Sequence, residues 1–252
     1  MPKRGVAALK RVFADLHMRL NTRDTIGMSR QIEKVAALGY RLIGVPLAPE
    51  VHTEEVVRLR AVCREAGMDF ASRVDLRARS PNELMRQLRR VRRKFEVICV
   101  CCESKTVARQ AAKDRRVDLL SFPLLDYRRR FFDRAEAELA RNGLAGLEVD
   151  VGRLLVLKGA ARVRLLSWLR REVAAAKKLG VPVVVSSGVA GELLLRKPRE
   201  MAALGFLFGL DEVSGLDAVS QSAWAIVKRN RAKLGDGFVA PGIRVVKEGT
   251  DC

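Results

Sequence analysis

An Asp-Leu-His segment follows a short apolar run near the beginning of the sequence, in FADLHMRL at residues 13–20. Asp15 and His17 could supply a carboxylate and a neutral imidazole, which are common ligands of catalytic metal ions. Glu148 and Asp150, at the end of a later apolar run, could complete such a site. These four residues define one hypothesis, a metal-dependent phosphoesterase.

The shortage of histidine argues against this hypothesis. Barrels of the polymerase-and-histidinol-phosphatase type have a His-x-His pair on the first strand, but here Arg19 occupies the second position. A guanidinium stays protonated and cannot bind a metal. The only other histidine, His52, is expected near the start of the second helix. We therefore predict no metal site, and we interpret His17 as a hydrogen-bonded residue at a strand end.

A second group of residues could bind an anion. Ser186, Ser187 and Gly188 follow the apolar run VPVVV, and backbone N–H groups in such a turn can hold a phosphate. Arg196 and Arg199 follow closely in the sequence. One interpretation is a barrel enzyme that anchors a small phosphorylated substrate here. The other is a tight turn with solvated charges, since no general base is evident nearby.

Basic residues are concentrated in RQLRRVRRK at residues 86–94, where six of nine residues are basic. If residues 80–95 form a helix, its exposed side carries only arginine and its other side carries an apolar stripe of Leu84, Leu88 and Val91. The arginines on the exposed side are Arg86, Arg89, Arg90 and Arg93. Like charges at these spacings destabilise a helix. A polyanionic partner would remove this cost. The alternative is that the basic run is only a solvated helix face.

The segment at residues 115–140, RRVDLLSFPLLDYRRRFFDRAEAELA, is expected to contain a strand, a proline-marked turn and a helix. The helix is predicted to begin near Asp126 and to place four residues against the core: Phe131, Phe132, Ala135 and Leu139. Arg128, Arg129 and Arg130 are expected to point outward. Arg115 and Arg116 come before the strand, so they should lie at the end of the fold opposite the strands' carboxyl ends.

The overall charge favours a nucleic-acid partner. The chain has 48 Lys and Arg against 29 Asp and Glu, a net charge of +19. Such an excess repels itself in the folded state, and a polyanion would neutralise it and release counterions. A surface built for ion-pair networks would show a better balance of the two signs. Aromatic residues make up only 5% of the chain, so contacts with the phosphate backbone are expected to outweigh base stacking.

The cysteines indicate a reducing compartment, because an odd number does not suit a disulfide framework. They are Cys63, Cys99, Cys101, Cys102 and Cys252. We interpret those in CVCC as small buried apolar residues of a strand. The sequence has no apolar run long enough to cross a membrane and no evident signal peptide, so we predict a cytoplasmic protein without a membrane partner.

Short apolar runs alternate with stretches of helical periodicity along the whole chain. The strands are expected at 11–15, 41–45, 69–74, 96–101, 118–122, 145–150 and 181–186, with a weaker eighth near 209–213. Helix boundaries are marked by the capping sequence SPNE at residues 80–83 and by four glycines at helix ends, Gly39, Gly67, Gly143 and Gly180.

Eight strand–helix units in about 250 residues predict an α/β protein with a single (β/α)₈ TIM barrel over residues 1–252, with residues 241–252 as an extended tail. A doubly wound open sheet is the alternative. It is less favoured because no glycine-rich dinucleotide-binding loop follows the first strand.

Four segments resemble the RNase P protein component 3 family, the barrel subunit of archaeal and eukaryotic ribonuclease P. They are DLLSFP at 118–123, LEVDVGRLL at 147–155, VVVSSGVAGELLLRKPREMAALGFLFGL at 183–210 and AVSQSAWAIVKRNRAKLGDGFVAPGIRVV at 218–246. Their order and spacing extend the resemblance over residues 11–246. The family is related in fold to the phosphoesterase barrels, which accounts for FADLHMRL.

The resemblance implies a non-catalytic RNA-binding subunit of an endoribonuclease that removes the 5′ leader of precursor tRNA. The RNA subunit carries the active site and its Mg²⁺, so no catalytic residue and no cofactor are expected on this chain. The implied partners are RNase P RNA, precursor tRNA, a small ferredoxin-like protein and other RNase P proteins. From charge and position we predict RNA contacts at Arg73, Arg90, Arg93, Lys105, Arg116, Lys158, Arg164, Arg196 and Arg199.

Overall fold

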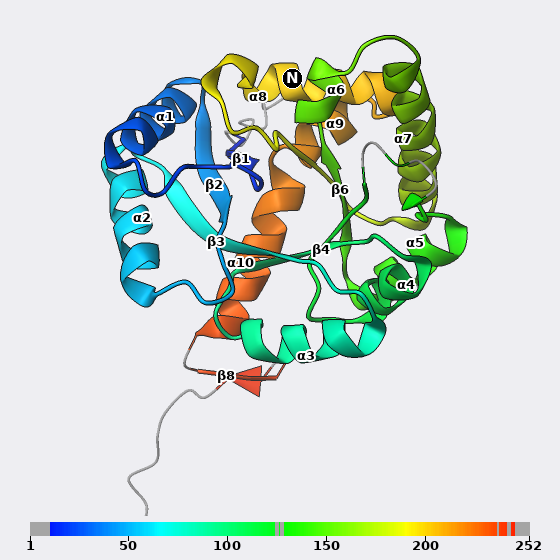
Figure 1. Ribbon diagram of the computed structural model, residues 1–252, viewed down its shortest axis with the longest axis horizontal. Helices are drawn as coiled ribbons and strands as arrows, with labels where there is room; N and C mark the ends of the chain where they lie inside the picture. Colours follow the sequence, from blue (N-terminus) through cyan, green and yellow to red (C-terminus); the bar gives the residue numbers. More distant parts are fainter. Residues whose placement is uncertain (1–10, 124–125, 127–128, 236, 241–242, 245–252) are drawn as a thin grey trace, which may run out of the picture.

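Seven parallel strands alternate with helices and form one sheet in which every strand pairs with its neighbours in the sequence (Figure 1). The computed structural model describes residues 11–123, 126, 129–235, 237–240 and 243–244. The strands are β1 (Phe13–Asp15), β2 (Tyr40–Pro46), β3 (Asp69–Leu76), β4 (Val97–Cys101), β5 (Leu119–Ser121), β6 (Gly146–Asp150) and β7 (Val183–Ser186). This sequential parallel order makes a nearly closed barrel, so the predicted fold class is confirmed.

Most of the helices lie outside this barrel and cover its outward-facing side chains. The helices are α1 (Thr25–Ala37), α2 (Thr53–Glu65), α3 (Pro81–Val91), α4 (Lys105–Lys113), α5 (Arg134–Gly143), α6 (Gly152–Val156), α7 (Gly159–Leu179), α8 (Pro198–Leu204), α9 (Glu212–Ala218) and α10 (Gln221–Leu234). No helix among the described residues is long and apolar enough to cross a membrane.

Helix α10 packs against the inside of the barrel. Among the described residues the barrel sheet consists of β1 to β7, because β8 (Phe238–Ala240) belongs to a separate hairpin. Ala223, Ile226 and Val227 of α10 form a small core with the inward-facing residues of the strands, among them Leu42. Backbone hydrogen bonds also join the two edges of the sheet, from Gly188 N to the His17 carbonyl oxygen and from Arg19 N to the Val189 carbonyl oxygen. Figure 1 shows α10, in orange, crossing the molecule past the strands.

The prediction of a strand near residues 209–213 is wrong. Gly209 has the left-handed φ of 94°, which ends the preceding 3₁₀ turn (Gly205–Phe208). The Asp211 side chain then accepts a hydrogen bond from Ser214 N at 2.9 Å and caps α9. An aspartate followed by Glu212 suits the positive end of a helix, and this local preference outweighs the weak apolar pattern of the segment.

The capping signals predict most helix ends correctly. Ser80 Oγ accepts a hydrogen bond from Glu83 N, and Pro81 begins α3. Gly39, Gly67 and Gly180 all have positive φ, as expected for residues that follow a helix.

Helix α5 ends differently, because Leu144 rather than Gly143 takes the left-handed conformation, with φ of 65°. A Cβ atom at Gly143 would lie 2.1 Å from the Ala112 carbonyl oxygen of α4. Close packing of α4 on α5 therefore requires a glycine at position 143. The left-handed conformation that ends the helix is taken by Leu144 instead.

The helix predicted to begin near Asp126 begins only at Arg134, because Asp133 is its N-cap and accepts a hydrogen bond from Glu136 N. Phe132 is buried and packs edge-on against Phe122, while Phe131 and Leu139 are half-buried. Ala135, expected in the core, is exposed.

Arg130 does not point outward as expected. It is buried and pairs with Glu172 of α7 through two hydrogen bonds. Arg129 is exposed, and Arg128 lies outside the described residues.

The expected tail falls mostly outside the described residues. Within it, β9 (Ile243–Arg244) pairs antiparallel with β8 (Phe238–Ala240), which follows α10.

Candidate functional site at the barrel mouth

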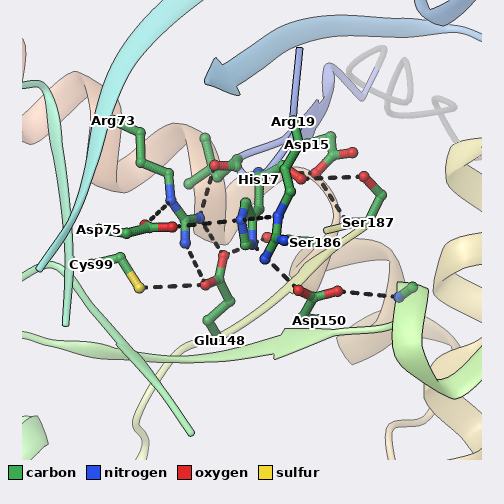
Figure 2. Close-up of polar contacts among 12 residues, drawn as sticks. Asp15, His17, Arg19, Arg73, Asp75, Cys99, Glu148, Asp150, Ser186 and Ser187 are labelled. Carbon is green, nitrogen blue, oxygen red and sulfur yellow. Dashed lines mark hydrogen bonds and ion pairs between the residues drawn. The ribbon is translucent and has the colours of Figure 1, made fainter. Parts of the chain in front are cut away.

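Arg73 of β3 lies inside the barrel near the carboxyl ends of the strands, with a fully buried side chain. Its Nη1 and Nη2 atoms donate to the two carboxylate oxygens of Glu148 on β6, at 2.5 and 2.7 Å. Its Nε donates to Asp75 at 2.7 Å and its Nη1 also donates to the Leu16 carbonyl oxygen at 2.9 Å (Figure 2). The guanidinium is thus held from three sides.

Glu148 has the complementary role in this pair. It also accepts hydrogen bonds from Ser186 Oγ at 2.8 Å and from Cys99 Sγ at 3.4 Å. Burial alone would raise its pKa, but the charge and hydrogen bonds of Arg73 outweigh burial and lower the pKa to about 2. Glu148 is therefore an ionised carboxylate paired with Arg73, and each of its oxygens already accepts two hydrogen bonds.

His17 lies beside this pair as a neutral imidazole. Its Nε2 accepts a hydrogen bond from Arg19 Nε at 3.3 Å, and its Nδ1 lies 3.4 Å from Asp150 Oδ2. Burial, with the nearby charge of Arg73, lowers its pKa to about 4. The imidazole is thus hydrogen-bonded at a strand end, in the environment predicted from the sequence.

Two aspartates fasten the loops at this end of the barrel. Asp15 Oδ1 accepts hydrogen bonds from His17 N at 3.1 Å and from Ser187 N at 3.0 Å, which joins β1 to β7. Asp150 Oδ1 accepts one from Gly152 N at 3.1 Å. Burial raises the pKa of both aspartates, and for Asp150 the negative charge of Glu148 adds to this and brings the pKa to about 7.

These residues are not arranged as a metal centre. Among the described residues, no group of three or more His, Cys, Asp or Glu side chains is placed to hold a metal ion. The space between Asp75 and Glu148 is occupied by the Arg73 guanidinium, a cation that neutralises the carboxylates without being able to bind a metal. The geometry therefore does not favour the phosphoesterase hypothesis.

The Ser186–Gly188 turn does not offer a phosphate site. The N–H groups of Ser187 and Gly188 are bonded to Asp15 and to the His17 carbonyl oxygen, respectively. Gly188 has φ of 61°, and a Cβ there would lie 1.9 Å from the Asp150 carboxylate. The turn closes the barrel edge, so the interpretation as an anchor for a small phosphorylated substrate is not supported by its geometry.

A polar cavity of about 140 Å³ remains at the mouth, bordered by Arg19, Arg77, Glu103, Phe122 and Asp150. Cys99 and Cys102 are buried as predicted for the CVCC segment, whereas Cys101 is only half-buried and also borders this cavity. Cys63 of α2 is buried as well. Cys252 lies outside the described residues. The Arg77 side chain pairs with Glu103 at 2.5 Å. The lining thus combines both charges and is not a simple anion pocket.

The residues predicted to contact RNA do not gather in one site. Arg73 must be removed from this set, because its buried guanidinium is fully used by Glu148, Asp75 and the backbone. Arg116 and Arg196 are half-buried: Arg116 pairs with Asp114, and Arg196 donates to two backbone carbonyls. The remaining six are exposed and lie in or next to α3, α4, α7 and α8: Arg90, Arg93, Lys105, Lys158, Arg164 and Arg199. Their contact with RNA stays a prediction.

One polar cluster does not follow from the sequence analysis. Asp118, just before β5, is buried and accepts hydrogen bonds from Arg92 at 2.8 Å and from Arg229 of α10 at 2.9 Å. In the sequence, Arg92 is one member of a basic run and Arg229 one cation of the last helix. The available signal is an acidic residue at the start of an apolar strand, where an unpaired charge would be costly.

Comparison with known proteins gives a consistent result. A family model described as RNase P subunit p30 matches residues 12–234. The chain is 30% identical to Ribonuclease P protein component 3 of Methanosarcina mazei over 221 residues, covering 87% of this chain and 91% of that protein. The corresponding protein of Methanosarcina barkeri is also 30% identical, over 86% of this chain and 90% of its own length.

Solved structures show the same fold. A chain in the cryo-EM structure of archaeal ribonuclease P with mature tRNA has a TM-score of 0.81 at 22% identity, covering 93% of this chain and 99% of that one. A putative prolidase from Bifidobacterium longum has a TM-score of 0.60 at 12% identity, covering 87% of this chain and 70% of that one. The likeness to the prolidase is one of fold alone.

Proposed function

The chain belongs to the RNase P subunit p30 family, and we propose on this basis that it acts as a protein subunit of ribonuclease P. In this role it binds the RNA of the enzyme and supports removal of the 5′ leader from precursor tRNA, without carrying the active site. The observation that carries the proposal is the match of the family model along almost the whole barrel, from residue 12 to residue 234.

The chemistry of the mouth supports a non-catalytic role. Its central carboxylate, Glu148, is bound to Arg73, and its imidazole, His17, is neutral and hydrogen-bonded to Arg19. A hydrolytic site needs a general base or a metal-bound water with access to substrate. The described residues of the mouth provide ion pairs instead, and these stabilise the fold.

The surface supports RNA binding. With a net charge of +19 and few aromatic residues, the protein is suited to phosphate contacts and to recognition of RNA shape. The exposed or half-buried cations Arg90, Arg93, Lys105, Arg116, Lys158, Arg164, Arg196 and Arg199 remain our candidate contacts.

The finer parts of the proposal concern partners and place. The direct RNA partners are RNase P RNA and, within the assembled enzyme, precursor tRNA. A small ferredoxin-like RNase P protein is a proposed protein partner, and Mg²⁺ is proposed to act on the RNA subunit. The family resemblance supports these assignments. We also propose a cytoplasmic location, in keeping with this role.

Reconstitution tests this function. Archaeal RNase P RNA, Mg²⁺ and the other archaeal RNase P proteins are combined with and without this chain, and removal of the 5′ leader from precursor tRNA is measured. Addition of the chain is expected to increase cleavage, whereas the chain without RNA is expected to leave the substrate intact. Cleavage by the protein alone, or equal cleavage in both mixtures, would contradict the proposal.

A further inference from the structure

Three elements that are far apart in the sequence are tied together at the end of the barrel opposite the mouth. Asp118, at the start of β5, holds Arg92 from the end of α3 and Arg229 from α10, at 2.8 and 2.9 Å. Arg92 also donates to the Arg116 carbonyl oxygen in the turn between α4 and β5, at 3.0 Å. Figure 1 shows α3 and the last turns of α10 at the same end of the molecule.

Cations without carboxylate partners surround this junction. We call them the basic pole: Arg89, Arg93, Lys94, Lys113, Arg115 and Lys233. Within the part of the chain that the structure describes, none of these six side chains forms an ion pair. Arg93 and Lys94 directly follow Arg92, while Lys113 and Arg115 adjoin the Asp114–Arg116 pair in the neighbouring turn.

The basic pole is crowded with positive charge. Burial lowers the pKa of Lys233, and the positive charges of Arg229, Arg92 and Arg115 lower it further. The carboxylate of Asp118 opposes this effect but is already shared by two arginines. Repulsion between the positive charges around Lys233 lowers the stability of the free protein, and a bound polyanion would reduce this repulsion.

Three arginines near the mouth of the barrel differ in this respect. Arg77 and Arg129 there face Glu103, at 2.5 and 3.9 Å, and Arg90 faces Glu50 at 4.0 Å. An RNA phosphate at any of these three arginines would have to displace the carboxylate that already faces it. At the basic pole no such exchange is needed, because its cations have no acidic partner among the described residues.

We propose that the basic pole, at the amino-terminal end of the barrel strands, is the main surface on which the phosphate backbone of a structured RNA docks. This inference rests on the proposed RNA-binding function and names its surface. Arginine binds phosphate through paired N–H donors. The hydrogen bonds from Arg92 and Arg229 to Asp118, which we call the Asp118 clamp, hold α3, α10 and the start of β5 together before RNA arrives. RNA binding therefore needs little additional ordering of the protein backbone.

Two triple variants with equal loss of charge test the surface. One removes charge at the basic pole, Arg93→Gln, Arg115→Gln and Lys233→Gln. The control removes the same number of arginines and lysines from exposed positions elsewhere, Arg153→Gln, Arg171→Gln and Lys197→Gln. Affinity for an archaeal RNase P RNA transcript is measured over a series of salt concentrations, and circular dichroism checks that both variants fold.

We expect the basic-pole variant to bind about tenfold or more weakly at low salt, with the slope of log K against log salt reduced in magnitude by about 2–3. The control should keep most of the wild-type slope. Equal loss in the two variants, or wild-type binding by the basic-pole variant, would overturn the inference. Failure of the unaltered protein to bind RNA would instead contradict the proposed function itself.

Crosslinking gives an independent readout on the unaltered protein. Ultraviolet crosslinking to the same RNA, followed by mass spectrometry, should recover peptides that contain residues 89–94, 113–116 and 228–233. Recovery of peptides from the mouth loops alone, with none from these three segments, would overturn the inference whatever the variants do.

Discussion

Arg73 and Glu148 form a bidentate ion pair inside the barrel, joining β3 to β6 across the barrel interior with hydrogen bonds of 2.5 and 2.7 Å. The pair takes the place at the mouth where a hydrolase would need reactive groups. Its charges are mutually neutralised, and the Glu148 carboxylate also accepts hydrogen bonds from Ser186 and Cys99. The pair is therefore a structural element, and its strength can be measured through stability.

Removing one partner should be far more harmful than removing both. Arg73→Met leaves Glu148 buried without its counter-ion, and the free energy of unfolding should fall by about 3–5 kcal/mol. The double variant Arg73→Met with Glu148→Leu should be more stable than the single variant Arg73→Met, because no unpaired charge remains. Urea unfolding of the two single variants and the double variant measures this coupling. Additive losses would mean that the two side chains do not depend on each other.

The sequence predicts the barrel well because most of its signals are local. Apolar runs locate all seven strands of the barrel sheet, and Ser80 with Pro81 locates the start of α3. The closure of the barrel could not be predicted in this way, since packing of α10 inside the sheet is a long-range contact that leaves no periodic pattern.

The site is harder to predict for a similar reason. The prediction that Arg73 contacts RNA treats it as a surface cation, although it stands in an apolar strand where an arginine needs a buried partner. Its partner, Glu148, lies 75 residues further along the chain, so only the fold brings them together. The same holds for the Asp118 clamp, whose two arginines come from α3 and α10.

Two helices end in a left-handed residue, which is a glycine in one (Gly180) and a leucine in the other (Leu144). Substitutions at these two positions should change the stability in opposite directions. Gly180 has φ of 68° and a Cβ added there would meet no atom within 4 Å, so Gly180→Ala should lower stability by about 1 kcal/mol through backbone strain alone. Leu144, half-exposed with φ of 65°, already bears this strain. Leu144→Gly should therefore raise stability by about 0.5–1 kcal/mol. Thermal unfolding of both variants checks the pair, and a loss on Leu144→Gly would show that its side chain contributes more than its strain costs.

Ionisation of the buried Asp150 side chain should lower the stability of the folded protein as the pH rises. Its pKa is raised by burial from 3.8 to about 7, so the folded protein holds a proton that the unfolded chain has released. Stability is then lost between these two values and stays lower above pH 7. Asp150→Asn keeps an acceptor for Gly152 N and removes this titration. The variant should be more stable than the wild type above about pH 7, by on the order of 1–3 kcal/mol, with a flatter pH dependence.

Denaturant unfolding over a pH series measures the Asp150 effect, with Glu148 as an internal contrast. The pKa of Glu148 is lowered to about 2, so its contribution is present above its ordinary value of 4.5 and is lost as the pH falls towards 2. An Asp150→Asn variant with an unchanged pH profile would show that Asp150 is ionised in the folded protein.

His17 distinguishes an RNA-supporting barrel from a hydrolase. Its imidazole accepts from Arg19 and lies beside Asp150, and no metal cluster is formed around it by the described residues. In reconstituted ribonuclease P, His17→Gln should therefore leave the rate of leader removal within about twofold of the wild type. Loss of a structural hydrogen bond lowers stability by about 1 kcal/mol, which leaves a domain of ordinary stability almost entirely folded. An enzyme that used His17 on a catalytic metal would lose activity by orders of magnitude.

The measurement for His17→Gln is single-turnover cleavage of precursor tRNA, with the unaltered chain and a mixture lacking the chain as references. The mixture without the chain sets the largest loss that a structural failure of this subunit could cause. A loss of that size, in a variant that folds and binds RNA normally, would place His17 in the reaction, because neither misfolding nor weak RNA binding could then account for it.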